Sequence, residues 1–283
     1  MNFQSTDAAP ALTPTGTLMA GRRGLIMGVA NGHSIAWGIA RALHAQGAEL
    51  AFTYQGEPFE KRVRPLTEQI GAKLVFDCDV EDSNSLGRVF DNLGAAWNKL
   101  DFVVHAIAHS DKNELKGRYV NTTRENFIRT MVISCYSFTD VARRAKALMP
   151  DGGSLLTLTY LGAERVMPNY NVMGVAKAAL ESSMRYLAVD LGRDRIRVNA
   201  ISAGPMRTLA GSAVGSARFV YNWNRQHAAL RKNVDLDEIG GAALYLLSPL
   251  SSGVSGEVHY VDGGYHIVGM PEPDALNGGD AEG

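Results

Sequence analysis

A tyrosine and a lysine in the segment YLGAERVMPNYNVMGVAK, residues 160–177, have the spacing of an acid pair. At about 1.5 Å rise per residue, Tyr170 and Lys177 lie about 10 Å apart along one face of a helix, where their long side chains can converge. A lysine ammonium favours the phenolate form of a nearby tyrosine and lowers its pKa. We therefore expect Tyr170 to donate a proton near neutral pH, with Lys177 lowering its pKa. The same spacing also fits a helix with one buried tyrosine and one solvated lysine.

The segments around this pair alternate between strand and helix. A short apolar run at 24–29 is followed by a glycine-bearing loop, GVANGHS, and then Ile35, Ile39 and Leu43 recur with the period of a helix. Further strands are expected at 49–54, 73–77, 102–106, 154–160, 197–203 and 257–261, and further helices at 83–97, 123–147, 170–190 and 237–247. This pattern predicts an α/β fold of the Rossmann type, a doubly wound, seven-stranded parallel sheet with helices on both faces, in a single domain.

Composition restricts the class of protein. The chain has 283 residues, of which 46% are hydrophobic and 20% charged, as in a globular protein with a sizeable core. Its net charge of −1 argues against nucleic acid or an anionic membrane as the main partner. Residues 1–20 lack the basic start and apolar run of a signal peptide or membrane span. We expect them to be a disordered leader, 21–269 to be one dinucleotide-binding domain, and 270–283 to be a disordered tail.

Cysteine and histidine usage indicates no metal site. Cys78 and Cys135 lie in apolar stretches without metal or redox spacing, so both are expected to be reduced core residues of a cytoplasmic protein. The seven histidines do not cluster.

The residues that follow the expected strands should meet at one edge of the sheet, where ligands of such folds bind. The glycines of GVANGHSIAWG depart from the G-x-G-x-x-G spacing, yet Gly28 permits a tight turn before Ala30. The amides around Ser34 and Ile35 open a helix whose positive end suits a pyrophosphate. A tight strand-to-helix turn without a ligand is the alternative.

The second and third strands indicate NADH as the dinucleotide. The tip of the second strand carries Gln55, which can bond a ribose hydroxyl, and Glu57, which would repel the 2′-phosphate of NADPH. Asp79 with Val80 can hold the adenine, the carboxylate accepting from its amino group. Asp79 as the N-cap of the next helix is the alternative.

Several strings in the chain resemble a known family. The glycine loop, Asp79-Val80, the Tyr170/Lys177 pair and RVNAISAGP at 197–205 resemble the short-chain dehydrogenase/reductase superfamily. Most of its members carry Y-x-x-x-K, but Met173 stands four residues before Lys177 here. The longer interval, the companion Tyr160 and strings such as YLGAER, NYNVMG and SGEVHYVDGG resemble bacterial NADH-using enoyl-acyl-carrier-protein reductases, from about Gly21 to Gly269.

This resemblance implies an activity and a set of roles. It implies reduction of the trans-2 double bond of an enoyl thioester on acyl carrier protein, in the final step of each cycle of fatty acid elongation, by a cytoplasmic homotetramer. Lys177 would bind the nicotinamide ribose, Tyr160 would line the acyl pocket, and Ser110 would meet the substrate. A strand-end aromatic that packs the sheet edge is the alternative for Tyr160. Further cofactor contacts are expected at Ala106, Ile107, Met206, Arg207, Thr208, Leu209 and Ala210.

The displaced tyrosine suits this chemistry. Hydride goes to the β-carbon while negative charge develops on the thioester oxygen several bonds away, so a donor shifted by one helical turn can meet that oxygen. The segment 211–233 has no clear period and carries Phe219, Tyr221 and Trp223, so we interpret it as a mobile flap over an apolar channel. An ordinary pair of amphipathic helices is the alternative.

Two other functions stay open. A ketone or alcohol oxidoreductase would carry Y-x-x-x-K and a serine about a dozen residues before the tyrosine. Thr157, thirteen residues before Tyr170, offers a hydroxyl there, but the tyrosine–lysine spacing disagrees. A non-catalytic nucleotide-binding protein could keep the same fold. Comparing crotonyl with acetoacetyl thioester as substrates separates the two enzymes, and NADH binding without turnover marks the third function.

Overall fold

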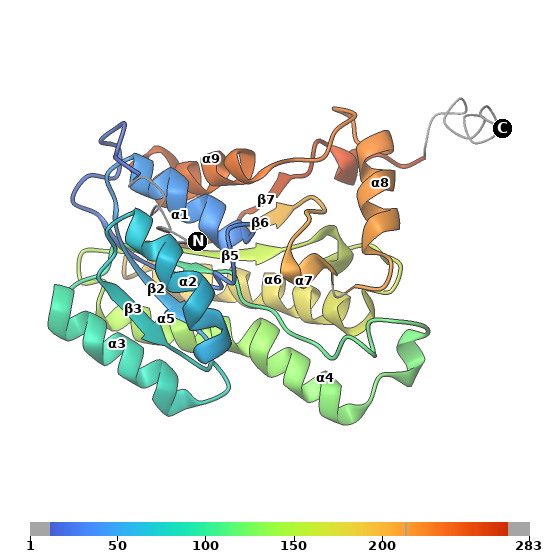
Figure 1. Ribbon diagram of the computed structural model, residues 1–283, viewed down its shortest axis with the longest axis horizontal. Helices are drawn as coiled ribbons and strands as arrows, with labels where there is room; N and C mark the ends of the chain where they lie inside the picture. The colour runs from blue at the N-terminus through green and yellow to red at the C-terminus, as the bar shows by residue number, and fades with distance from the viewer. Residues whose placement is uncertain (1–11, 213, 271–283) are drawn as a thin grey trace, which may run out of the picture.

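A computed structural model of the protein describes residues 12–212 and 214–270 (Figure 1). Its strands are β1 (Arg23–Met27), β2 (Glu49–Tyr54), β3 (Leu74–Asp77), β4 (Phe102–His105), β5 (Gly153–Thr159), β6 (Ile196–Ala203) and β7 (Val258–Val261). Its helices are α1 (Ile35–Ala45), α2 (Glu57–Gln69), α3 (Ser83–Trp97), α4 (Arg124–Met131), α5 (Ser137–Ala147), α6 (Asn171–Gly192), α7 (Leu209–Ser212), α8 (Ala217–His227) and α9 (Leu236–Leu247).

The strands form one parallel sheet in the order β3-β2-β1-β4-β5-β6-β7. The chain winds outward from β1 to β3 and then returns to the other side, so β1 pairs with both β2 and β4. The order therefore reverses between β1 and β4, and ligands of doubly wound sheets bind at such a reversal. The predicted fold is confirmed.

Alternate residues of the strands supply two hydrophobic cores. Ile26 points into the core that the sheet shares with α1, α2 and α9, whereas Leu25 and Met27 point into the core beneath α3, α5 and α6. The helices accordingly lie on both faces of the sheet (Figure 1). Strands buried on both faces explain the nearly continuous apolar runs of the sequence.

Two expectations about the elements are corrected. The single helix expected at 123–147 is interrupted, because Val132–Tyr136 form a π turn between α4 and α5. Residues 12–20, expected to belong to a disordered leader, pack on the end of α1. Thr15 and Gly16 donate backbone hydrogen bonds to Ala45 O, and Met19 has no exposed surface. Residues 1–11 and the tail after Met270 lie outside the described residues.

No helix within residues 12–212 and 214–270 combines the length and the apolar character needed to cross a bilayer.

Candidate active site

The first site residue, Gly28, lets the chain after β1 approach the chain after β4 closely. Its φ is +101°, and a Cβ there would lie 2.1 Å from Ala106 O, so only glycine allows this approach. Ala106 N–H in turn donates to Met27 O at 3.0 Å. The chain leaves β1 and β4 side by side at the reversal point, where the dinucleotide is expected.

Ser34 closes the glycine loop rather than capping the helix with its side chain. Its Oγ accepts from Ala30 N–H at 3.0 Å and from Asn31 N–H at 3.1 Å, and it makes no side-chain cap bond to α1. The Ala30 amide is therefore engaged within the loop. Trp37 N–H donates to Ser34 O at 2.9 Å, whereas the N–H groups of Ile35 and Ala36 have no acceptor one turn back in the helix and suit an anion.

The tip of β2 is negatively charged. Gln55 is exposed, and the next residue, Gly56, donates its N–H to Asp77 Oδ1 at 2.8 Å. The Arg64 guanidinium lies 5.7 Å from the Tyr54 ring centroid, but it is paired with Glu60 at 2.6 Å. A carboxylate beside the tip and a neutralised arginine favour a ribose hydroxyl over a 2′-phosphate, in agreement with the predicted NADH.

Asp79 is not the helix cap. Its Oδ1 accepts from Glu81 N–H at 2.9 Å, whereas Asp82 caps α3 by accepting from Asn84 N–H. Val80 packs half-buried against the core beneath α3. The capping alternative for Asp79 is therefore wrong, and its role toward adenine stays a prediction.

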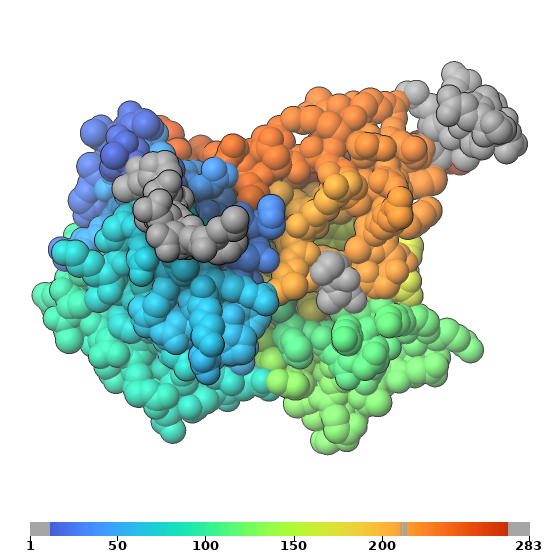
Figure 2. All heavy atoms as spheres, in the orientation of Figure 1, coloured from blue at the N-terminus to red at the C-terminus, as the bar shows by residue number. Residues whose placement is uncertain are grey.

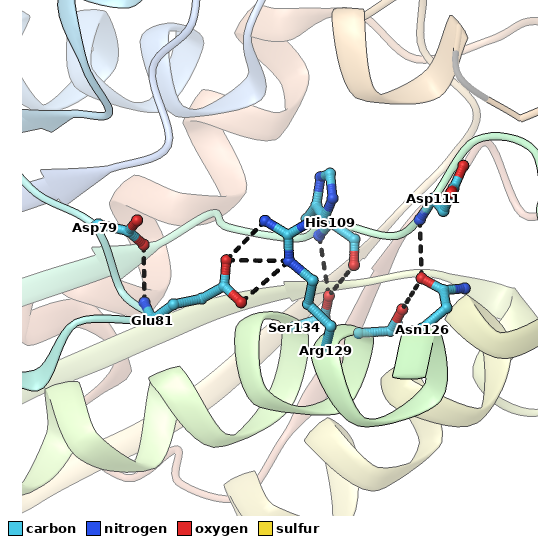
Figure 3. Close-up of polar contacts among 8 residues, drawn as sticks. Asp79, Glu81, His109, Asp111, Asn126, Arg129 and Ser134 are labelled. Atoms are coloured by element: carbon cyan, nitrogen blue, oxygen red, sulfur yellow. Dashed lines mark hydrogen bonds and ion pairs between the residues drawn. The ribbon is translucent and has the colours of Figure 1, made fainter. Parts of the chain in front are cut away.

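The loop after β4 is held from α4 and the π turn (Figure 3). Ser134 Oγ accepts from His109 N–H at 3.0 Å and donates to His109 O at 3.1 Å. Asn126 Oδ1 accepts from Asp111 N–H at 3.0 Å, and Thr130 Oγ1 donates to Ser110 Oγ at 2.9 Å. Neither Ser134 nor Asn126 was predicted as an anchor of this loop, because nothing in the sequence distinguishes them from the other serines and asparagines.

Ser110 is buried, and its hydroxyl is bonded to Asn126 and Thr130. The hydroxyl thus has a structural role toward α4, and the contact of Ser110 with the substrate stays a prediction. Ile107 is half-buried against the core beneath α3 and lies in the same loop, near the reversal point.

Tyr160 and Tyr170 meet edge to face, with ring centroids 5.1 Å apart. Two glycines make room for Tyr170. A Cβ on Gly162 would lie 2.4 Å from Tyr170 Cδ1, and a Cβ on Gly174 would lie 2.7 Å from Gly162 O. These two glycines were not predicted as site residues either, although their positions in YLGAER and NVMGVAK, close to the two tyrosines, could have indicated them. The structure brings the two predicted tyrosines together at the carboxyl end of β5.

Lys177 lies on α6, two helical turns after Tyr170, and is buried. Its Nζ donates to Leu158 O at 2.8 Å. Burial lowers the pKa of Lys177 to about 8, while the nearby Cys135 and Glu181 act in the opposite direction. Glu181 is itself buried and accepts from Thr159 Oγ1 at 2.6 Å, and burial raises the pKa of its carboxyl.

The predicted lowering of the Tyr170 pKa is not found. Burial raises the pKa of the Tyr170 phenol above its ordinary value, and the charges of Tyr160 and Glu181 add to that rise. Burial likewise raises the pKa of Tyr160. The Lys177 ammonium is directed to the Leu158 carbonyl group, so it does not offset the desolvation of the phenol.

The segment after β6 faces the glycine loop across a cavity of about 190 Å³, lined by His33, Met206, Arg207, Tyr221, Val234, Asp235 and Leu236. The Arg207 guanidinium lies 4.6 Å from the Tyr221 ring centroid, which links this segment to α8. Thr208 Oγ1 accepts from Gly211 N–H at 2.9 Å, and Leu209 is exposed. The side chain of Ala210, also predicted to bind the cofactor, lies outside the described residues.

The segment interpreted as a flap contains α7 and α8, so the helical alternative describes its secondary structure. In the space-filling view α8 stands apart from the body of the protein, and the surface beside it is hollowed (Figure 2). Beneath this segment a small apolar cluster surrounds Tyr170; it contains Leu115, Met131, Val172, Met173, Ala176 and Val214. Apolar side chains from four parts of the chain therefore gather where an acyl chain is expected.

Within the part of the chain that the structure describes, no three histidine, cysteine, aspartate or glutamate side chains are placed to hold a metal ion.

Comparison with known proteins gives one consistent match. A family model described as Enoyl-(Acyl carrier protein) reductase matches residues 28–266. The chain is 62% identical over 265 residues to Enoyl-[acyl-carrier-protein] reductase [NADH] 2 of Rhizobium meliloti, covering 94% of this chain and 99% of that protein. A crystal structure of the reductase of Anaplasma phagocytophilum in complex with NAD superposes with a TM-score of 0.89 at 59% identity, covering 92% of this chain and 100% of that one. The Bacillus cereus reductase with NADP+ and indole naphthyridinone gives a TM-score of 0.88 at 48% identity, covering 90% and 100%.

Proposed function

The chain belongs to the enoyl-(acyl carrier protein) reductase family and is an oxidoreductase that reduces enoyl thioesters with NADH; from this premise we propose roles for its residues. When bound, NADH supplies the hydride that reaches the β-carbon of the trans-2 double bond. The glycine approach at Gly28, the start of α1 and the acidic tip at Asp77 fit such a cofactor at the reversal point of the sheet.

Tyr170 is the proton donor in this proposal. Its phenol is held by Gly162 and by the ring of Tyr160, and it borders the apolar cluster under α8. A phenol in this place can donate to the thioester oxygen as negative charge develops there, in a site with little water to compete. The paired tyrosines at the carboxyl end of β5 are the single observation that carries this assignment. Lys177 binds the nicotinamide ribose, and Tyr160 borders the acyl chain.

The competing keto reductase needs a hydroxyl that can reach the reacting carbonyl group. Thr157 has no exposed surface, and its Oγ1 lies 3.3 Å from His105 Nδ1, inside the protein. This side chain therefore gives no support to that function. The displaced spacing of Tyr170 and Lys177 also favours enoyl reduction.

A direct test is NADH consumption with trans-2-enoyl thioesters of increasing length, with acetoacetyl thioester and NADPH run in parallel. We expect turnover of the enoyl series with NADH and none of the keto substrate. The Tyr170→Phe variant should lose about 10²-fold or more in kcat while still binding NADH. Unchanged turnover by Tyr170→Phe would remove Tyr170 from this role.

We further propose that acyl carrier protein docks beside α8. Arg218 and Arg225 are exposed and seven residues apart on this helix, so they share one of its faces. An acidic carrier protein would be attracted to that face. Lys232 lies in the segment after this helix and is paired with Glu238.

A homotetramer in the cytoplasm completes the proposal. The outer sides of the π turn and of α6 expose large apolar side chains, namely Tyr136, Val175, Tyr186 and Val189. Such residues are typical of a surface that a second copy covers. Sedimentation of the full chain tests this state, and a monomer at micromolar concentration would contradict it.

A further inference from the structure

The π turn between α4 and α5 is built around one hydroxyl group. The backbone N–H of Ser137 donates to Val132 O, five residues back, instead of to Ile133 O. Ile133 O therefore loses the donor that an α-helix would give it. Ser137 Oγ replaces that donor and donates to Ile133 O at 2.6 Å. The side chain of Ser137 thus satisfies the carbonyl group that the π turn leaves unpaired.

His105 completes this arrangement from the sheet. It is the last residue of β4 and has no exposed surface. Its Nε2 lies 2.8 Å from Ser137 Oγ, and its Nδ1 lies 3.3 Å from Thr157 Oγ1. Because the proton of Ser137 Oγ is used on Ile133 O, this oxygen accepts from the imidazole, which places the ring proton on Nε2. Burial lowers the pKa of His105 to about 3, and the charge of Lys177 acts in the same direction, so the ring is neutral.

The π turn holds two parts of the active site. Ser134 bonds both the N–H and the carbonyl group of His109, and so fixes the loop after β4 (Figure 3). Cys135 lies beside Lys177, close enough for each group to shift the pKa of the other. The turn also packs directly on α6, which carries Lys177. A displacement of this turn would therefore reach the loop and the lysine together.

We propose that His105 is a positioning residue, which through Ser137 seats the π turn and thereby sets the loop of His109 and the surroundings of Lys177. The inference rests on the proposed function in one respect, namely that the nicotinamide end of the cofactor lies at this loop. If His105 only filled the core, it would need no hydrogen-bond donor toward Ser137. A glutamine at position 105 would then preserve activity no better than a leucine.

The matched variants are His105→Gln, which keeps a donor toward Ser137, and His105→Leu, which removes it at similar volume. Phe138→Leu is the control for lost packing, because its ring is fully buried with its centroid 5.3 Å from that of His105. We expect His105→Leu to raise the KM for NADH and lower kcat by about tenfold each, since small displacements at a reacting centre are costly. His105→Gln should stay within about threefold, and Phe138→Leu should lose thermal stability with both constants within about twofold.

Hydrogen exchange gives a readout that needs no activity. In Ser137→Ala the amide of His109 should exchange faster than in the parent protein, because the turn that carries Ser134 is released. This variant also serves if His105→Leu does not fold. Equal kinetic losses in Phe138→Leu and His105→Leu, or unchanged exchange at His109 in Ser137→Ala, would overturn the inference. Failure of the parent enzyme to turn over enoyl thioesters would instead refute the proposed function and leave the exchange result valid.

Discussion

A methyl group added at Gly162 should disable the enzyme without unfolding it. Its carbon would lie 2.4 Å from Tyr170 Cδ1 and 2.7 Å from Tyr170 Cε1. Ordinary contact begins at 3.4 Å, so the ring must move by 3.4 − 2.4 = 1.0 Å in the Gly162→Ala variant. Tyr160 Cδ1 would also lie within 3.3 Å of the added carbon, so both tyrosine rings crowd the methyl group. A displacement of about 1 Å at a reacting group costs about 10²-fold in rate, or about 2.7 kcal/mol of transition-state stabilisation.

The assay is NADH oxidation with a trans-2-enoyl thioester, with kcat, KM and thermal stability measured on each variant. Overpacking should lower the free energy of unfolding by about 1–3 kcal/mol, so the enzyme stays folded at 25 °C. Gly241→Ala is the control, because it lies in helix α9 and an added Cβ would meet nothing within 4 Å. It should gain up to about 1 kcal/mol of stability and keep its kinetics. If Gly162→Ala retained kcat within about twofold, the glycine would not position Tyr170.

Three further outcomes follow from charged groups. The affinity of the free enzyme for NADH should weaken by up to about tenfold from pH 7 to pH 9, because Lys177, with its pKa lowered to about 8, loses its positive charge. Fluorescence titration measures this affinity. The Lys177→Met variant should bind NADH weakly at both pH values, without the pH dependence. Because the pKa of Glu181 is raised in the folded protein, its carboxyl loses the proton at lower pH in the unfolded chain than in the folded one. The free energy of unfolding therefore falls as the pH rises from 4.5 through the folded-state pKa. Denaturant titrations should show a gain in stability of Glu181→Gln over the parent that grows with pH, and a constant difference would contradict the raised pKa. The exposed pair of Arg129 with Glu81, at 2.9 Å, should contribute less than about 1 kcal/mol, and the effect of Arg129→Ala should shrink in 1 M salt.

The sheet was predictable, whereas the exact course of α4 and α5 was not. The alternation of apolar runs with helical periods leaves few topologies once connections must be short and right-handed, so the order around β1 follows from the sequence. The residues VISCY of the π turn have no propensity that separates it from an α-helix. The turn depends on bonds from Ser137 and His105, which are 32 residues apart in sequence. The burial of Met19 escaped for a similar reason, since its segment has no periodic pattern and packs through backbone bonds to the end of α1.

Spacing could place Lys177 two helical turns after Tyr170, but it could not give the direction of the pKa shift of the phenol. Spacing shows which groups share a helix face, whereas desolvation depends on what covers them. Here Tyr160 and the close approach of Gly162 cover the phenol. Lys177 lies two turns below and bonds the Leu158 carbonyl group. Burial therefore outweighs a cation that the linear sequence places within reach.

A raised pKa is compatible with proton donation by Tyr170. The thioester oxygen becomes basic only as hydride arrives, and the phenol must still hold its proton at that moment. Burial keeps Tyr170 protonated throughout the working range of pH, so the phenol adds no alkaline limb of its own. We therefore expect an alkaline limb in kcat/KM for NADH to come from Lys177, whose pKa is lowered to about 8. The residual activity of Tyr170→Phe should therefore fall with pH along the same limb as the parent enzyme, and a limb that vanished in this variant would assign the titration to the phenol instead.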